Sequence, residues 1–169
     1  MAKDFLNVVE RALIMGMSDK INSVTADGED VYVFGQFPET EELKFPAVVV
    51  QQVASGIEEN FYGDKVMFGD DTTQSDGEIY GIGFVIHIIT DRESKLTVDS
   101  KKYKQRRLLN WLMLNIANAL KDIDWDIYKE EELEVIETHV LAWNDIGHMA
   151  QLHWYGASCR MSVTFLNKR

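Results

Sequence analysis

The sequence predicts an α+β domain in which a mixed or antiparallel sheet of about four main strands is flanked by an N-terminal helix and one long central helix. Residues 99–121 contain neither Gly nor Pro and repeat apolar residues at helical spacing. Residues 47–53 and 78–90 are rich in β-branched and aromatic residues, as strands are. With 169 residues, 46% of them hydrophobic, the chain suits a single domain, 1–169, that buries its own core.

In the N-terminal part the sequence predicts a first helix, then a polar loop that carries one short strand, and then a buried strand. Gly16 marks the expected end of the helix. Residues 18–45 are polar and acidic around a short apolar run at 31–34, and Pro46 stands directly before the buried strand predicted at 47–53. The apolar residues at helical spacing are Phe5, Val8, Val9 and Ala12.

A mobile loop is expected over residues 56–77. Glycines, aspartates and serines there surround one apolar island, and loops of this length in compact domains usually serve a function. A hairpin within this segment is the alternative. The island and the acids that follow it are Lys65, Val66, Met67, Phe68, Asp70 and Asp71.

The segment 78–90 is the strongest strand in the sequence. Both of its alternating faces are largely apolar, which predicts burial on both sides. Helices are expected on one face, and a helix or another subunit on the other. Gly81 and Gly83 lie on the same face and leave room for a close approach.

The long helix is predicted from Asp99 to Lys121, with Asp99 or Ser100 as its N-cap. One face provides a core stripe: Leu109, Leu112, Met113, Ile116, Ala117 and Leu120. The opposite face carries Tyr103, Arg107, Trp111, Leu114 and Asn118. Because this second face includes Trp and Leu, it is expected to be covered as well.

The last part of the chain predicts a hairpin. Two strands, 133–143 and 149–166, flank a turn expected at 144–147, whose Asn, Asp and Gly favour turns. The second strand alternates apolar and polar residues near its end, which indicates a sheet with one wetter face.

The net charge of the chain argues against nonspecific binding to polyanions. The chain has 17 Lys and Arg against 28 Asp and Glu, a net charge of −11, which disfavours nonspecific binding to nucleic acid or anionic membranes. No apolar run comes close to the length of about 18 residues that a membrane span needs, and the single cysteine fits a reducing compartment.

The charges are unevenly distributed along the chain. Basic residues are concentrated in 95–107, whereas acidic residues are concentrated in 27–30, 39–42 and 122–134. Such asymmetry suits docking subunits, and a solvated helix end is the alternative.

The chain lacks the standard motifs for binding phosphate or dinucleotide and those of serine hydrolases and zinc proteases, so no catalytic residue, cofactor or metal is predicted. His148, His153 and Asp145 could assemble into a metal site, although polar residues at a strand end explain them as well. Cys159 lies in the apolar register of a strand, where cysteine is most often a core residue.

The order of segments resembles the tail terminator proteins of long-tailed bacteriophages, also called tail completion or minor tail proteins. The resemblance spans nearly the whole chain. It rests on an N-terminal helix, FPAVVVQQV after an acidic loop, GEIYGIGFVIHIITD after a long loop, LLNWLMLNIANAL, and a hairpin closing in CRMSVTFLNKR.

The resemblance implies a structural virion protein, not an enzyme, at the head-proximal end of the tail. In that family a hexameric ring caps the tail tube, ends its polymerisation and provides the surface for head attachment. Other copies of the chain, the major tail tube protein and head–tail connector proteins are the expected partners, and DNA passes through the ring without specific binding. Folding is expected in the host cytoplasm, and no membrane is involved.

The candidate subunit interface combines the second helix face with the basic residues before it: Tyr103, Arg107, Trp111, Leu114, Lys101 and Lys102. The candidate tube-docking residues belong to the expected loop 56–77: Lys65, Val66, Met67, Phe68, Asp70 and Asp71. Two alternatives stay open, a head–tail neck or connector protein and, from another class, a small metal-dependent hydrolase that uses His148, His153 and Asp145.

Overall fold

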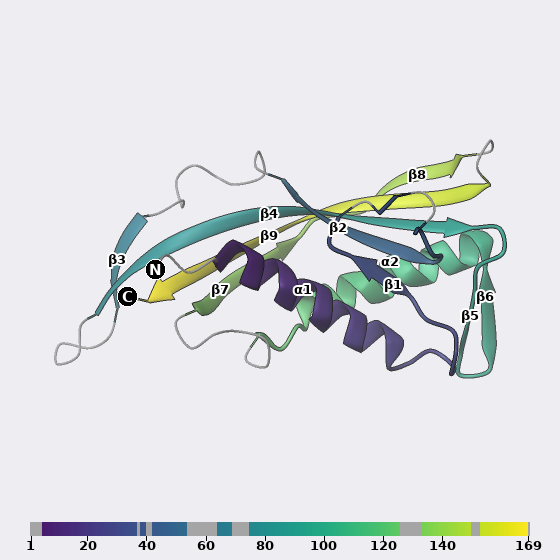
Figure 1. The fold of residues 1–169 in the computed structure, drawn as a ribbon, viewed down its shortest axis with the longest axis horizontal. Helices are drawn as coiled ribbons and strands as arrows, with labels where there is room; N and C mark the ends of the chain where they lie inside the picture. Colours follow the sequence, from purple (N-terminus) through teal and green to yellow (C-terminus); the bar gives the residue numbers. More distant parts are fainter. Residues whose placement is uncertain are drawn as a thin grey trace.

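The structure, a computed structural model, describes residues 5–36, 38–39, 42–53, 64–68, 75–125, 133–149 and 153–168. These residues form helices and a mixed sheet, so the predicted α+β class is confirmed (Figure 1). The helices are α1 (Phe5–Asn22) and α2 (Gln105–Lys121). The strands are β1 (Tyr32–Phe34), β2 (Ala47–Val53), β3 (Asp64–Phe68), β4 (Ser75–Asp91), β5 (Lys95–Val98), β6 (Lys101–Lys104), β7 (Leu133–Val140), β8 (Asn144–Met149) and β9 (Trp154–Lys168).

Seven strands form one sheet in the order β1-β2-β4-β9-β7, with β3 also paired to β4 and β8 to β9. β1 is parallel to β2 and the other pairs are antiparallel. β4 and β9 pair along fifteen residues, from Gly77 with Lys168 to Asp91 with Trp154. The sheet therefore has more strands than the roughly four main strands that the sequence predicts. The additional ones are the short strands β1, β3 and β8 at its margins.

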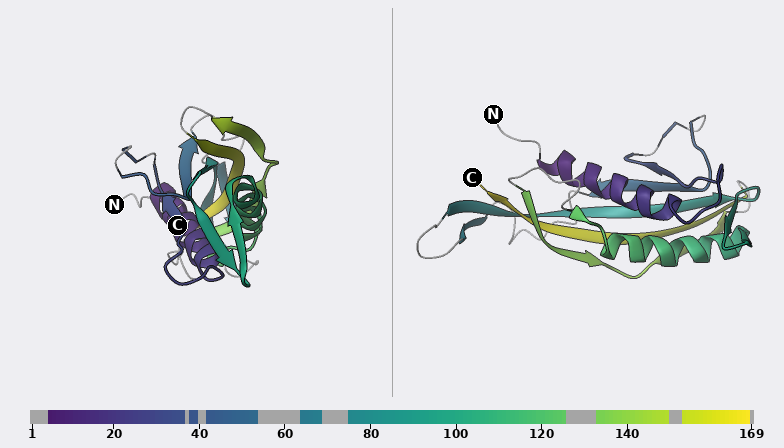
Figure 2. Two further views of the ribbon diagram at one scale, coloured as in Figure 1. Left: turned by 90° about the vertical axis from the view of Figure 1, so that its right-hand side faces the viewer. Right: turned by 90° about the horizontal axis from the view of Figure 1, so that it is seen from below.

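Both helices lie on the same side of the sheet (Figure 2). The core forms between them and the inward side chains of β4 and β9, including Phe84 and Phe165, which are 1% and 0% exposed. The core stripe of α2 is confirmed at Leu109, Leu112, Ile116 and Leu120, all fully buried, whereas Met113 and Ala117 are half-buried. Leu108 and Ala119 are buried in addition.

α1 continues beyond Gly16 to Asn22, so the expected stop was wrong. Its apolar stripe extends past the glycine through Met17 and Ile21, both buried, and this burial outweighs the low helix propensity of one glycine. Beyond the helix, the Asn22 side-chain amide donates to the Val31 carbonyl at 3.1 Å and accepts from its N–H at 2.8 Å. Within the described residues, no helix is long and apolar enough to cross a membrane.

The second face of β4 is only partly covered. Gly83 is buried, but Val85, His87 and Ile89 keep partial exposure, so burial on both sides holds for part of the strand. Near the end of β4, Phe45 from the loop before β2 packs against Trp154 at the start of β9, and their ring centroids lie 5.2 Å apart. Desolvation lowers the pKa of His87.

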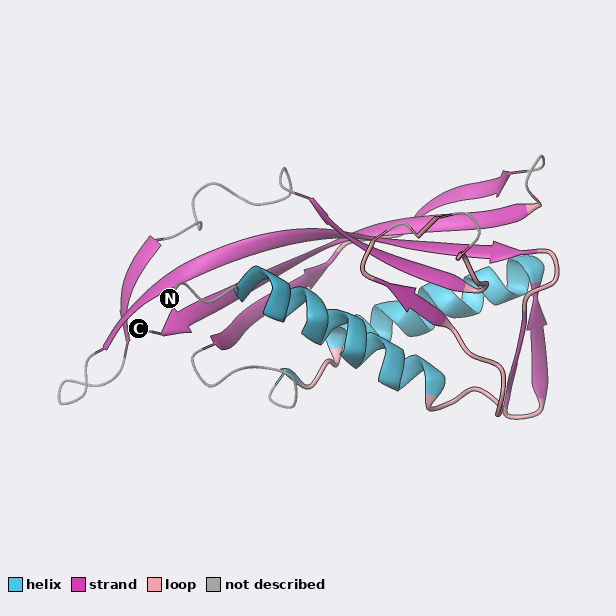
Figure 3. Ribbon diagram, viewed as in Figure 1, coloured by secondary structure: helices cyan, strands magenta, loops and turns pink. Residues whose placement is uncertain are grey.

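The prediction that one helix spans 99–121 was wrong at its start. Asp99 and Ser100 have φ values of 51° and 66° and lie between the paired residues Val98 and Lys101. Positive φ at both central residues is the signature of a type I′ hairpin turn. Residues 95–104 therefore form the β5–β6 hairpin, and α2 begins at Gln105 (Figure 3).

The expected loop 56–77 contains strand. β3 pairs antiparallel with the start of β4, from Asp64 opposite Ile79 to Phe68 opposite Ser75. The alternative of a hairpin in this segment is thus the observed one. Asp70 and Asp71 lie outside the described residues, as do the side chains of residues 64–68.

The C-terminal hairpin forms, but its turn is not where the sequence predicts it. Residues 144–149 are strand β8, which pairs with β9 from Asn144 opposite Ser158 to Met149 opposite Trp154. β7 lies farther along the same strand, and the Leu141 N–H donates to the Arg160 carbonyl between them at 2.9 Å. Continued pairing with β9 therefore outweighs the turn preference of Asn144 and Gly147.

Candidate assembly surface and polar pocket

The predicted interface residues divide between two elements. Tyr103 lies on β6 and Trp111 on α2, yet their ring centroids are 5.9 Å apart with planes inclined by 36°. Trp111 is half-buried and packs against the core. The hairpin of the same chain thus covers part of the face that was expected to need a partner.

Leu114 is the uncovered part of that face. It is 63% exposed, although it belongs to the helix that carries the core stripe. Arg107, earlier on α2, is also exposed. Protein interfaces commonly have an apolar centre and a polar rim. An exposed leucine with cationic residues on the same helix and the hairpin before it fits that composition.

Lys101 and Lys102 lie on β6, not on the helix, and both are exposed. The hairpin register places Lys95 opposite Lys104 and Thr97 opposite Lys102, so three lysines share one face. We call β5–β6 the basic hairpin. None of its lysines forms an ion pair within the described part of the chain.

One acidic segment lies beside the basic hairpin within the same subunit. The Ala26 N–H donates to the Thr97 carbonyl at 3.0 Å. The Glu29 carboxylate accepts hydrogen bonds from the Thr97 N–H and hydroxyl. Residues 27–30 are therefore neighbours of the hairpin in one chain, which leaves the other acidic segments as candidates for a counterpart across an interface.

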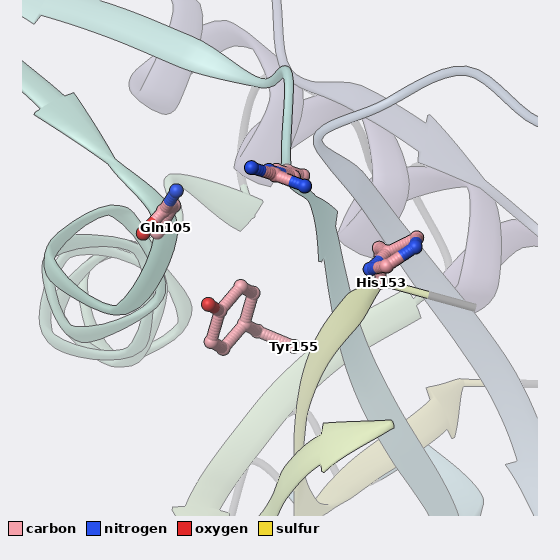
Figure 4. Close-up of a pocket in the computed structure, with 4 residues that line it drawn as sticks. Gln105, His153 and Tyr155 are labelled. Atoms are coloured by element: carbon pink, nitrogen blue, oxygen red, sulfur yellow. The ribbon is translucent and has the colours of Figure 1, made fainter. Parts of the chain in front are cut away.

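A polar pocket of about 250 Å³ opens at the end of the sheet near the basic hairpin, and no sequence pattern predicts it (Figure 4). Arg92 follows β4, and Gln105 is the first residue of α2. His153 directly precedes β9, and Tyr155 lies at the start of that strand. Gln105 and His153 have positive φ, 50° and 54°. Three distant segments meet here, so no local spacing could have indicated the pocket.

The metal alternative receives no support from the described side chains, which contain no group of three or more His, Cys, Asp or Glu placed to hold an ion. The side chains of Asp145 and His148 lie outside the described residues. His153 is exposed at the pocket. His139 lies 2.9 Å from Glu137, but both are largely exposed, and such surface pairs contribute little.

Cys159 lies in the core, as the sequence predicts. It is 2% exposed, and burial raises its pKa to about 12. A thiol in this state is a poor nucleophile, because the thiolate is the reactive form.

No family model matches this chain, and a search of curated proteins finds no match either.

Proposed function

We propose that this chain is a structural virion protein whose ring caps the phage tail tube, ends its polymerisation and offers the surface for head attachment. The order of the sequence segments suggests the family, and one structural observation supports assembly. Leu114, 63% exposed on the central helix, lies on the face that the basic hairpin covers only in part. Single exposed leucines are common on protein surfaces, so the support comes from the position of Leu114 on the helix face that the sequence predicts to be covered.

A closed ring of identical subunits uses two different patches of each subunit, and one patch meets the other on the neighbour. We assign the first patch to Leu114, Arg107 and the basic hairpin. For the second patch we assign the edge strand β7 and the residue after it, where Ile136 and Leu141 are 53% and 58% exposed. The two patches lie on different elements, as a heterologous interface requires.

The remaining partners follow from the ring. We assign tube docking to the β3–β4 hairpin, which lies at the end of the molecule opposite the basic hairpin (Figure 1). The net charge of −11 favours passage of DNA through the ring without binding. A filter-binding assay that shows tight, salt-sensitive DNA binding would contradict that part of the proposal.

Electron microscopy and tube assembly test the function directly. We expect six-fold rings with a central opening of tail-tube width, and shorter tubes when the protein is added to polymerising tube subunits. A monomer at micromolar concentration, or tubes of unchanged length, would rule the proposal out. Metal analysis separates it from the hydrolase alternative, because the proposed protein is not an enzyme and requires no metal.

A further inference from the structure

One edge of the basic hairpin is engaged within the chain. Its two-residue turn is closed by Val98 and Lys101, which such turns make a hydrogen-bonded pair. Antiparallel pairs alternate, so the next pair, Thr97 with Lys102, directs its main-chain groups away from the hairpin. At Thr97 both groups find partners in the acidic segment beside β5, as this alternation requires.

The other edge of the hairpin, on β6, is open. By the same alternation Lys102 directs its N–H and its carbonyl away from β5. Neither group has a hydrogen-bond partner among the described residues, and Lys102 is exposed. An open strand edge of this kind is a template to which another strand can add.

β7 forms a second open edge, at the margin of the large sheet. The Leu141 N–H bonds to the Arg160 carbonyl, so alternation directs the main-chain groups of Val140 and Thr138 away from β9. These groups too have no partner within the described part of the chain. The hairpin lies at one end of the molecule and β7 farther along it, in a separate sheet, so the two edges do not pair within one subunit (Figure 1).

The two open edges carry opposite charge. β6 has the sequence KKYK, and its three lysines are exposed. β7 carries the exposed Glu134 and Glu137, and the acidic segment 122–134 runs into this strand in the sequence. Like charges on facing strands repel, so neither edge favours pairing with the same edge of a second copy. Pairing of β6 with β7 brings opposite charges together, and it is heterologous, as a ring requires.

We propose that β6 of one subunit pairs through its main chain with β7 of the next copy, so that strands continue across each subunit boundary. This contact rests on the proposed ring function and specifies how its two patches meet. Hydrogen bonds between the main chains provide affinity, while the opposite charges of the two strands select the partner and disfavour self-pairing.

Hydrogen exchange tests the pairing directly. In rings of the full chain, the amides of Lys102, Thr138 and Val140 should exchange at least about tenfold more slowly than in dissociated monomers, because new hydrogen bonds protect them. The Tyr103 amide is the internal reference, since alternation places its hydrogen bond inside the hairpin, and its exchange should change little. Rings whose three edge amides exchange as fast as in the monomer would overturn the pairing and leave the ring function intact. Protection that appears only after tube subunits are added would assign these edges to the tube, and would also overturn it.

Lys102→Pro removes the outward N–H of β6. Proline is tolerated on an edge strand where the missing N–H faces solvent, so the monomer should stay folded. Association into rings should weaken at least about tenfold, since a carbonyl of the neighbouring strand loses its donor. Lys102→Ala is the matched control, because it removes the same charge and keeps the N–H, and it should weaken association less. Equal weakening in both variants, measured by sedimentation, would show that charge alone matters and refute the main-chain pairing.

An exchange of charges tests the choice of partner. Lys101→Glu with Lys102→Glu reverses the charge of β6, and Glu134→Lys with Glu137→Lys reverses that of β7. Each double variant alone should remain a folded monomer, because like charges then face each other. A one-to-one mixture should form rings of alternating subunits, which sedimentation detects. A mixture that stays monomeric, or either double variant forming rings alone, would contradict the pairing of β6 with β7.

Two further outcomes separate the contact from the function. Rings that form with protected edge amides but leave tube length unchanged would contradict only the proposed function. A wild-type chain that stays monomeric at micromolar concentration would contradict both.

Discussion

The two faces of α2 show how one helix serves both a core and a surface. Leu112 and Ile116, on the inner face, are fully buried against the sheet. Leu114, between them in sequence, is 63% exposed on the outer face. Trp111 is intermediate, because the basic hairpin folds back onto it through Tyr103. An apolar residue on the outer face of a helix is therefore not enough to indicate a partner, since the same chain can cover it.

The largest expected effect concerns the inner side, and it is a change in the reactivity of the buried thiol on folding. Cys159 belongs to the core on the inner side, and burial raises its pKa from 9.0 to about 12. A raised pKa leaves less thiolate at any pH below it, so alkylation at pH 8 should be about a thousandfold slower than in the unfolded chain. Labelling with iodoacetamide, with and without denaturant, measures the ratio. Equal rates in the two conditions would mean that the thiol is accessible and ordinary.

Truncation on the inner face should destabilise the fold. Leu112→Ala or Ile116→Ala removes a fully buried side chain and leaves a cavity, which typically lowers the free energy of unfolding by about 2–5 kcal/mol. Urea denaturation followed by circular dichroism measures the change. A midpoint unchanged in both variants would show that this face is not the core.

Trp111→Ala should have a mixed effect. Loss of its contact with Tyr103 and of its partial burial should lower the free energy of unfolding by about 1–3 kcal/mol. Assembly should weaken as well, because the basic hairpin loses its support. Sedimentation of the folded variant together with urea denaturation separates the two contributions. A variant that folds as stably as the wild type would place Trp111 entirely in an interface.

The smallest expected effect on folding comes from Leu114→Asp. Because the side chain is exposed, the free energy of unfolding should change by about 0.5 kcal/mol or less. The ring, however, should dissociate into folded monomers in sedimentation. Met15→Asp provides a matched control, since Met15 is an apolar residue of α1 that is 40% exposed. Rings that persist in Leu114→Asp would refute the assignment of this surface.

The sequence predicted the elements whose pattern is long and regular. β4 and the body of α2 were found because apolar spacing over many residues distinguishes strand from helix. The basic hairpin was missed because its lysines suit a helix and Asp99-Ser100 also suits an N-cap. Only the alternation of Leu96 and Val98 with polar residues indicated strand, and this signal is too short to decide.

The candidate sites show the same limit. Tyr103 and Trp111 were placed on one surface by helical spacing, and they do meet, but the chain between them changes from strand to helix at Gln105, where φ is 50°. The pocket could not be predicted at all, because Arg92, Gln105 and Tyr155 become neighbours only when β4, α2 and β9 are packed. Local pattern predicts elements, whereas the meeting of their ends depends on tertiary structure.

The long pairing of β4 with β9 has a kinetic consequence. Its fifteen residue pairs all join distant parts of the chain, and even the pair nearest in sequence, Asp91 with Trp154, encloses α2, the basic hairpin and β7. Such contacts form only after large loops have closed, and loop closure costs conformational entropy before any contact stabilises the chain. Folding should therefore be slow, on the order of milliseconds to seconds. Until β9 arrives, β4 presents an open apolar edge to other chains. Molecules of this protein are thus most prone to aggregate before the sheet closes.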